Sequence, residues 1–288
     1  MIREITVLSG KGGTGKTTVT AALAALAKTT VFSDCDVDAA DLHLLLHPEI
    51  IEAYPFESGW KVSIDKDVCT SCGMCAEACR FNAIHLHHGS FVVDPYQCEG
   101  CRLCERICPV SAITSQRSMN NFWYVSDTRF GPLVHAQMGP GEENSGKLVT
   151  TVRKKAKEIA EDLNFSLILN DGPPGIGCPV ISSITGVDTV VMITEPSSSG
   201  LHDVERLVGL TGKFNLETFA VINKYDLHPE MGRKIEKKLA TLGVPLIAKI
   251  PFDENMVNSM VWGKTIIEFD PNAESTRILR GIWETITK

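Results

Sequence analysis

The chain has 288 residues, of which 43% are hydrophobic and 22% are charged, as in ordinary globular proteins. Its formal net charge of -7 argues against a nucleic-acid partner, because binding DNA or RNA requires a basic surface that neutralises phosphates. No signal peptide is evident, and no apolar run reaches the ~20 residues that span a bilayer. We therefore expect a cytoplasmic protein that does not attach to membranes.

The first predicted elements are a strand, a glycine-rich loop and a helix. Residues 5–8 are mainly β-branched and aliphatic, and residues 16–28 are rich in alanine and other strong helix formers. A second strand is predicted at 30–34. This strand leads into a run of four nearby carboxylates, Asp34, Asp36, Asp38 and Asp41.

The segment from 60 to 115 differs from the rest of the chain, because cysteines recur there every three or four residues and no long helix fits. Beyond it, strands are predicted at 166–169, 189–194, 218–222 and 245–250, and helices at 147–163, 201–210, 229–242 and from 273. This alternation predicts an α/β fold with a doubly wound, mostly parallel sheet. We therefore expect one discontinuous domain, 1–59 and 116–288, interrupted by a small α+β domain at 60–115.

The loop after the first strand has the composition of a phosphate-binding loop. Its glycines allow backbone N–H groups to point at a triphosphate and let the phosphates approach closely. Lys16 would supply positive charge to the terminal phosphates, and the hydroxyl of Thr17 would hold Mg²⁺. The sequence therefore predicts that ATP or ADP binds with Mg²⁺ at a loop made of Gly10, Lys11, Gly12, Gly13, Thr14, Gly15, Lys16, Thr17 and Thr18.

This loop, with its additional lysine at position 11, resembles that of the MinD, ParA, Mrp and nitrogenase iron-protein superfamily of P-loop ATPases. The resemblance extends over the chain outside 60–115. It implies that Lys11 reaches the nucleotide of a facing subunit in an ATP-dependent dimer. Both a homodimer and a heterodimer with a paralogue remain open.

The same resemblance implies roles for residues that follow later strands. Asp36 matches a switch aspartate that orients water or the Mg²⁺ shell, and Asp171 matches a carboxylate that holds Mg²⁺ through water. Asp34, Asp38 and Asp41 are alternatively solvated carboxylates without such a role. Asn223 and Pro251 match positions that contact adenine. The expected catalytic residues are therefore Lys11, Lys16, Asp36 and Asp171.

Eight of the ten cysteines form two copies of the pattern C-x2-C-x2-C-x3-C. Thiolates at this spacing bind three irons of one cubane, and the fourth cysteine of each run binds the other cluster. The segment closely resembles the bacterial two-cluster ferredoxin. One 4Fe-4S cluster is therefore assigned to Cys69, Cys72, Cys75 and Cys108, and the other to Cys98, Cys101, Cys104 and Cys79. Zinc is the competing metal, although its sites usually combine two cysteine pairs across a longer spacer.

The two remaining cysteines are Cys35 and Cys178. Cys178 stands seven residues after Asp171, the offset of a bridging-cluster cysteine in nitrogenase iron protein. The second cysteine that such a bridge needs is missing, because none lies between Cys108 and Cys178. We expect both Cys35 and Cys178 to be small buried residues.

Three functions fit these modules. The first is a redox-linked ATPase, in which nucleotide-dependent dimerisation controls electron transfer through both clusters to a protein redox partner. The second is an iron–sulfur carrier or assembly ATPase that delivers clusters to a client. The third is a positioning or partner-binding ATPase like MinD and ParA, with structural or sensing clusters. We expect the first, and the sequence identifies neither client nor electron acceptor.

Overall fold

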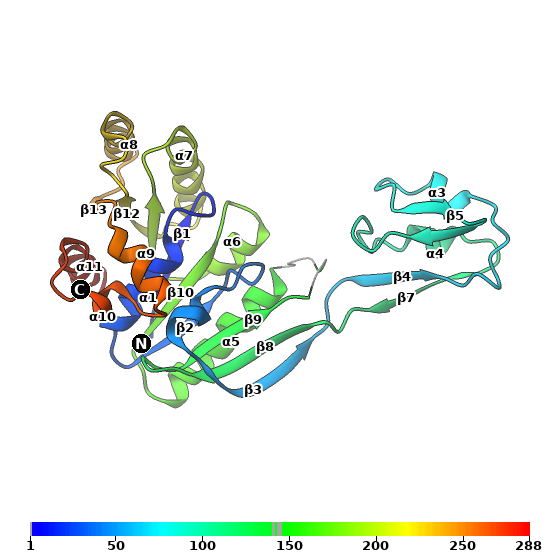
Figure 1. The fold of residues 1–288 in the computed structure, drawn as a ribbon, viewed down its shortest axis with the longest axis horizontal. Coiled ribbons are helices and arrows are strands. Elements are labelled where there is room, and N and C mark those ends of the chain that lie inside the picture. The colour runs from blue at the N-terminus through cyan, green and yellow to red at the C-terminus, as the bar shows by residue number, and fades with distance from the viewer. Residues whose placement is uncertain (1, 140–141, 143–145) are drawn as a thin grey trace. The chain divides into compact units, whose positions relative to one another are not determined.

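The computed structural model describes residues 2–139, 142 and 146–288, which form two compact units (Figure 1). The large unit comprises Met1–Ala53, Trp123–Gln137 and Asn144–Lys288. The small unit comprises Tyr54–Phe122 and Met138–Glu143. The predicted boundaries at 60 and 115 fall inside the small unit, close to where its first and last strands begin and end.

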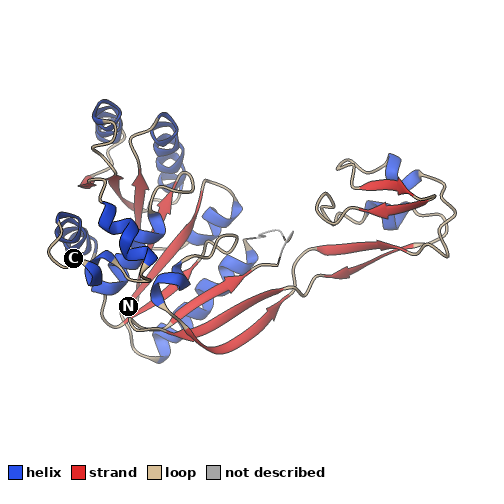
Figure 2. Cartoon of the chain, viewed as in Figure 1, coloured by secondary structure: helices blue, strands red, loops and turns tan. Residues whose placement is uncertain are grey.

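A nine-stranded sheet, ordered β13-β12-β11-β1-β10-β2-β9-β8-β3, organises the large unit (Figure 2). Every neighbouring pair from β13 to β9 is parallel. These parallel strands are β1 (Arg3–Ser9), β2 (Thr30–Asp34), β9 (Leu133–Gln137), β10 (Leu167–Pro174), β11 (Thr189–Thr194), β12 (Glu217–Asn223) and β13 (Leu246–Ile250). The sheet continues into β8 (Asn121–Asp127) and β3 (Glu49–Phe56). The sequence analysis did not predict β3, β8 or β9.

Helices pack on both faces of this sheet, as the alternation of elements predicted. One face carries α1 (Lys16–Leu26), α10 (Ile266–Phe269) and α11 (Glu274–Ile286), and the other carries α6 (Cys178–Ile184), α7 (Ser198–Lys213) and α8 (Pro229–Thr241). Alternate residues of one strand enter different core clusters: Val191 belongs to the first and Met192 to the second. The remaining helices are α2 (Leu42–Leu46), α5 (Lys147–Asp162) and α9 (Glu254–Val261).

The doubly wound α/β fold is therefore confirmed for the large unit. Strand β2 occupies the predicted residues, whereas helix α1 ends two residues earlier than predicted. No helix among the described residues is long and apolar enough to cross a membrane.

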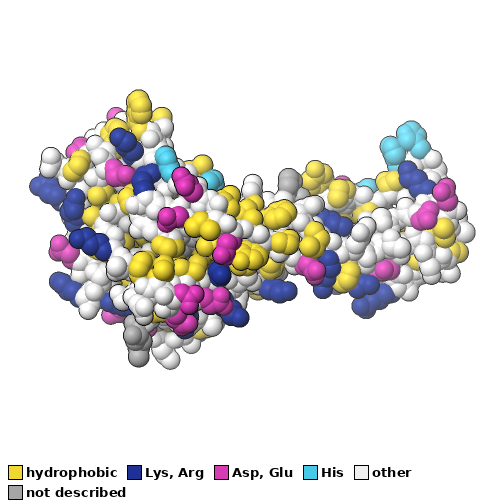
Figure 3. Space-filling view, turned by 90° about the horizontal axis from the view of Figure 1, so that it is seen from below, with side chains coloured by type: hydrophobic (Ala, Val, Ile, Leu, Met, Phe, Trp, Pro, Cys, Tyr) yellow, Lys and Arg dark blue, Asp and Glu magenta, His cyan; other side chains and the backbone are white. Residues whose placement is uncertain are grey.

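The small unit consists of short elements. Strands β4 (Trp60–Ile64) and β7 (Ile113–Arg117) pair antiparallel, as do β5 (Ile84–His87) and β6 (Ser90–Val93). Two single-turn helices, α3 (Met74–Glu77) and α4 (Leu103–Ile107), lie within the two cysteine runs. Among the described residues, its core cluster has three buried members, Cys75, Ile84 and Ile113. The histidine side chains of this unit are exposed and lie together on its surface (Figure 3).

Candidate functional site

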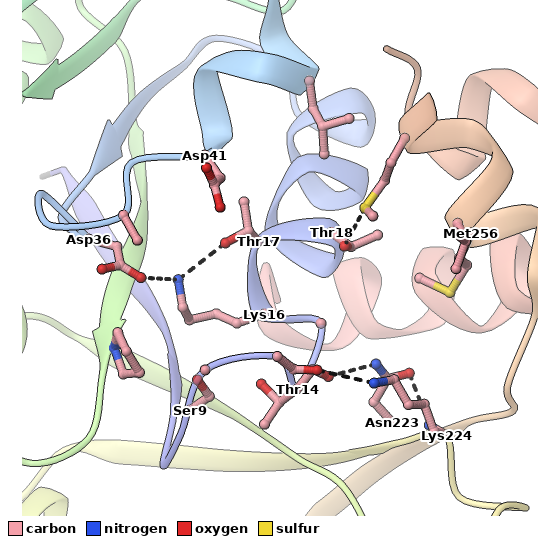
Figure 4. A pocket seen from close by; sticks show the side chains of 18 of the residues that line it. Ser9, Thr14, Lys16, Thr17, Thr18, Asp36, Asp41, Asn223, Lys224 and Met256 are labelled. Carbon is pink, nitrogen blue, oxygen red and sulfur yellow. Dashed lines mark hydrogen bonds and ion pairs between the residues drawn. The ribbon is translucent and has the colours of Figure 1, made fainter. Parts of the chain in front are cut away.

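The glycine-rich loop joins β1 to α1 in the large unit, and its geometry depends on glycine. Gly15, the residue before α1, has a φ of 88° in the left-handed region that side chains disfavour. A Cβ atom there would overlap the side-chain amide of Asn223. Asn223 Nδ2 donates a hydrogen bond to the carbonyl oxygen of Thr14 at 2.8 Å, so the end of β12 supports the loop (Figure 4).

The loop borders a cavity of about 490 Å³. Residues 12–18 line it, together with Asp36 after β2, Asn223 at the end of β12 and Pro251 after β13. A ligand site at the carboxyl ends of parallel strands is the usual position in this class of fold. Gly10, Lys11 and Asp171 lie outside the lining.

Thr14 carries a polar atom that lacks a partner. Thr14 is 2% exposed, and its hydroxyl oxygen is buried without any hydrogen-bond partner in the described part of the chain. Leaving a buried hydroxyl unpaired costs about 1–3 kcal/mol. Because the hydroxyl can donate a proton, an anionic oxygen entering the cavity would satisfy it.

Lys16 lies among acidic side chains at the start of α1. Its Nζ is 3.0 Å from Asp171 Oδ2. It is also 3.5 Å from Asp36 Oδ2 (Figure 4). Thr17 Oγ1 donates to Asp171 Oδ2 at 2.7 Å, and Thr20 Oγ1 donates to Asp171 Oδ1 at 2.8 Å. The structure thus brings together Lys16, Thr17, Asp36 and Asp171, which the sequence analysis proposed for one site.

This cluster has more acidic than basic groups. Burial and the neighbouring Asp171 raise the pKa of Asp34 well above its usual value, and burial raises the pKa of Asp36 to about 6. Burial works against the charge of Lys16, yet the carboxylates of Asp171 and Asp36 raise its pKa. The excess of negative charge suits an incoming cation.

Asp34 itself is not the solvated carboxylate that the alternative interpretation of the sequence describes. It is 0% exposed, because it ends β2 beside Asp171 on the neighbouring strand β10. Asp38 and Asp41 are exposed, and Asp41 also lines the cavity, so the alternative stays a prediction for these two residues.

Lys11 is engaged within its own chain. Its Nζ lies 2.6 Å from Glu195 Oε1 and 3.4 Å from Ser197 Oγ. Lys224 Nζ lies 3.5 Å from the other oxygen of Glu195 and donates to the carbonyl oxygen of Gly13. Although burial works in the opposite direction, the hydrogen bond and charge of Lys11 lower the pKa of Glu195.

Glu195 was missed by the sequence analysis. Its position directly after β11 was the available signal, because side chains that follow parallel strands gather at the ligand edge of the sheet.

The far end of the cavity is mainly apolar. Leu44 and Leu45 come from α2, and Met256, Val257 and Met260 come from α9. Thr18 Oγ1 contacts Met260 Sδ at 3.1 Å (Figure 4). Asn223 Oδ1 accepts the backbone N–H of Lys224, so both ends of its amide already have a partner. The adenine-binding role of Asn223 and Pro251 stays a prediction.

The cysteines of the small unit fall into two cavities, one for each predicted group of four. A cavity of about 270 Å³ is lined by Cys79, Cys98, Cys101 and Cys104, and one of about 20 Å³ is lined by Cys69, Cys72, Cys75 and Cys108. Cys75 also borders the larger cavity, so the two are neighbours. All ten cysteines are free thiols.

The cysteine that ends each run has the same local setting. Ala83 N donates to Cys79 Sγ at 3.4 Å, and Ala112 N donates to Cys108 Sγ at 3.3 Å. Burial raises the pKa of the Cys104 thiol to about 11, so a cation would be needed to stabilise its thiolate at neutral pH.

The other two cysteines differ from each other. Cys35 is fully buried, as predicted, whereas Cys178 is exposed at the first residue of α6, so the prediction of a buried side chain was wrong for it. Within the described residues, no group of three or more His, Cys, Asp or Glu side chains is arranged to hold a single metal ion.

Comparison with known proteins decides the family. Residues 5–266 match the model of the CobQ/CobB/MinD/ParA nucleotide binding domain. The chain belongs to this family. An uncharacterised protein of Methanocaldococcus jannaschii is 31% identical, with 99% of this chain and 97% of that protein aligned. The septum site-determining protein MinD of Synechocystis is 26% identical over 93% of this chain and 82% of its own length.

Solved structures agree on the fold. The Pyrococcus horikoshii MinD structure, described as complexed with Mg-ADP, superposes with a TM-score of 0.60 at 20% identity and covers 100% of this chain and 97% of that one. Membership of the CobQ/CobB/MinD/ParA family confirms the prediction of a P-loop ATPase. The comparisons do not support electron transfer as the main function and do not show the ferredoxin-like segment.

Proposed function

We propose that the chain is a MinD/ParA-like ATPase in which Mg²⁺ and ATP control partner binding, and that its small unit holds two 4Fe-4S clusters with a structural or sensing role. The main support for the first part is the cluster of Lys16, Thr17, Asp36 and Asp171 beside the unpaired hydroxyl of Thr14. The named relatives favour partner binding over electron transfer, since they include MinD proteins and a MinC:MinD complex from Aquifex aeolicus.

In this proposal the loop residues bind the nucleotide phosphates. The backbone N–H groups of residues 12–16 surround the phosphates, and the Thr14 hydroxyl donates to a phosphate oxygen. Lys16 leaves Asp171 and contacts the terminal phosphates instead. Thr17 and Asp171 would hold Mg²⁺, Thr17 through its hydroxyl and Asp171 through water, because Mg²⁺ usually keeps several waters and takes few protein ligands. Asp36 orients the water that attacks the terminal phosphate.

Dimerisation completes the proposed cycle. Lys11 leaves Glu195 and reaches the nucleotide of a second subunit, either another copy of the chain or a paralogue. The family members from Pyrococcus and Aquifex establish only the shared fold. Sedimentation with a non-hydrolysable ATP analogue would test directly whether the dimer forms.

The second part of the proposal concerns the cysteines. Each cavity gathers three cysteines of one run and the last cysteine of the other, a donor set that suits a cubane. Four irons each take one thiolate, so the sulfur atoms lie farther apart than around a single ion. When bound, the clusters supply one-electron chemistry and link distant segments of the small unit, whose proposed limits are 60–115.

Electron transfer through the small unit is the second candidate function. The observation that favours it is that Cys75 lines both cavities, which makes the two sites neighbours. The acceptor would be a protein redox partner.

One experiment tests both parts of the proposal. The chain is purified without oxygen and assayed for ATP hydrolysis, iron, acid-labile sulfide and zinc. We expect ATP hydrolysis together with the iron and sulfide of two 4Fe-4S clusters. Zinc without sulfide would overturn the cluster assignment, and loss of hydrolysis in a fully loaded protein would overturn the ATPase assignment. Electron transfer would instead be favoured by a cluster reduction potential that shifts when ATP replaces ADP.

A further inference from the structure

Asp34 is a buried carboxylate whose two oxygens hold the two ends of one loop. Its Oδ1 accepts the backbone N–H of Asp36 at 3.1 Å, and its Oδ2 accepts the backbone N–H of Leu42 at 3.1 Å. The residues between these two donors form the loop that leads from β2 to α2. Its acidic members, apart from Asp36, are exposed.

The two bonds differ in what they fix. A bond to the N–H two residues ahead is a common turn of aspartate and is local. The bond to Leu42 spans eight residues and reaches the first residue of α2. Asp41, which precedes that helix, makes no capping bond through its side chain. Asp34 therefore provides from the sheet the acceptor that a helix start usually receives from its own N-cap residue.

The closed loop places Asp36 beside Lys16. Cys35 N donates to the carbonyl oxygen of Asp171 at 2.8 Å, which fixes the entry to the loop on β10. Asp34 fixes the start and the end of the remaining segment. Within this frame Asp36 Oδ2 lies 3.5 Å from Lys16 Nζ.

We propose that Asp34 is a positioning residue for ATP hydrolysis, because its carboxylate holds the loop 35–42 in the shape that presents Asp36 to the terminal phosphate. This inference rests on the role proposed for Asp36. Asp34 lies outside the cavity lining and touches neither nucleotide nor metal in the proposed arrangement. Its effect is therefore on the rate of hydrolysis and not on nucleotide affinity.

The test compares Asp34→Asn and Asp34→Ala in the full chain. Asparagine keeps one oxygen acceptor but turns an N–H₂ group toward one of the two donors, whereas alanine removes both acceptors. Losing a buried hydrogen bond that holds the loop of Asp36 is expected to lower kcat about tenfold for asparagine and more for alanine. The affinity for Mg-ADP is expected to change less than about threefold, since binding uses the glycine loop.

Replacing Asp34 also changes the electrostatics of the site, so kcat is measured over a range of Mg²⁺ concentrations. A positioning role predicts that kcat stays low at saturating Mg²⁺. Recovery of the rate at high Mg²⁺ would overturn it in favour of a purely electrostatic effect. Faster hydrogen exchange of peptides covering 35–46 in both variants is expected, and unchanged exchange would also overturn the inference.

Two further variants separate this inference from the proposed function. Asp38→Asn changes an exposed carboxylate of the same loop and is expected to keep wild-type kcat. Asp36→Asn is expected to lose most hydrolysis. If Asp36→Asn hydrolyses ATP normally, the role of Asp36 in the proposed function fails. If Asp36→Asn is inactive while both Asp34 variants keep wild-type kcat, only the inference about Asp34 fails.

Discussion

The nucleotide site of the large unit and the cysteine sites of the small unit are built in opposite ways. The first draws Lys16, Asp36 and Asp171 from distant parts of the sequence, and a wide parallel sheet with helices on both faces fixes them. The second draws on cysteines a few residues apart, most of them in the loops that flank two single-turn helices, beside a small core. The large unit therefore has a core that can fix an empty site, whereas we expect the small unit to depend on the clusters proposed for it.

The largest effect is expected from removing the charge that binds the phosphates. Lys16→Ala should abolish ATP hydrolysis and weaken ATP binding, because no other side chain of the loop contributes a charge beside Asp171. Iron and sulfide should remain at the wild-type level, since the proposed cluster ligands all belong to the small unit. Metal analysis and a hydrolysis assay check both statements.

Lys28→Ala changes an exposed lysine after the same helix and should behave as wild type. Loss of iron in Lys16→Ala would contradict the expectation that the nucleotide site and the cysteine sites are independent of each other.

Metal removal should affect the small unit and leave the large unit unchanged. After chelation under reducing conditions, the small unit is expected to unfold, because its three-residue core replaces little of the order that the clusters provide. The large unit should retain its melting transition and its affinity for Mg-ADP. Limited proteolysis, followed by identification of the cut sites, measures where the chain opens.

Cys178→Ser serves as the matched control, because this exposed thiol lies outside both cysteine cavities. Cleavage confined to the large unit would count against a cluster-dependent small unit.

A smaller effect is expected at Glu142, which ties the small unit together. Its side chain is 2% exposed and lies 3.0 Å from Lys61 Nζ. Although burial works in the opposite direction, hydrogen bonds from Ser118, Ser58, Lys61 and Asn121 lower the pKa of Glu142 to about 2. Glu142→Gln should therefore destabilise the small unit by about 2 kcal/mol, the scale of a lost charge-assisted bond.

The sign of the pH dependence follows from this lowered pKa. The ionised carboxylate stabilises the folded state above its ordinary pKa near 4.5, and this contribution is lost as the pH falls toward about 2. Thermal unfolding from pH 6 to pH 3 measures it: the wild type should lose stability more steeply than Glu142→Gln. Equal slopes would show that the carboxylate does not contribute. Glu57→Gln, at an exposed glutamate of the same unit, is the control.

The sequence predicted the two kinds of site to different depths. The glycine loop and the cysteine runs are local patterns: residues 12–18 of the loop line one cavity, and each predicted group of four cysteines lines another. The sheet was predicted from its central strands, but β3 was missed because most of its residues are exposed and give no alternating apolar pattern. The bond from Asp34 to Leu42 and the pairing of Lys11 with Glu195 depend on how the loops fold, which residue type and spacing do not encode.

The smallest effect is expected at Glu195, because its contact with Lys11 is made in the isolated subunit and would be lost in the proposed dimer. Glu195 pairs with Lys11, so the isolated chain holds the lysine that the dimer needs. The side chains are 36% and 19% exposed, and pairs of this kind contribute about 0.5–1 kcal/mol. Glu195→Gln should therefore tighten ATP-dependent dimerisation about two- to fivefold, because Lys11 no longer has to leave a carboxylate.

Sedimentation with a non-hydrolysable ATP analogue measures this change, and Glu205→Gln on α7 is the control because Glu205 pairs with Lys238 instead. A weaker dimer in Glu195→Gln would mean that Glu195 orients Lys11 for the facing nucleotide and does not restrain it. Lys11→Ala distinguishes the two cases further. If Glu195 only restrains Lys11, Glu195→Gln should have no effect on dimerisation once Lys11 is absent, since the residue it releases no longer exists.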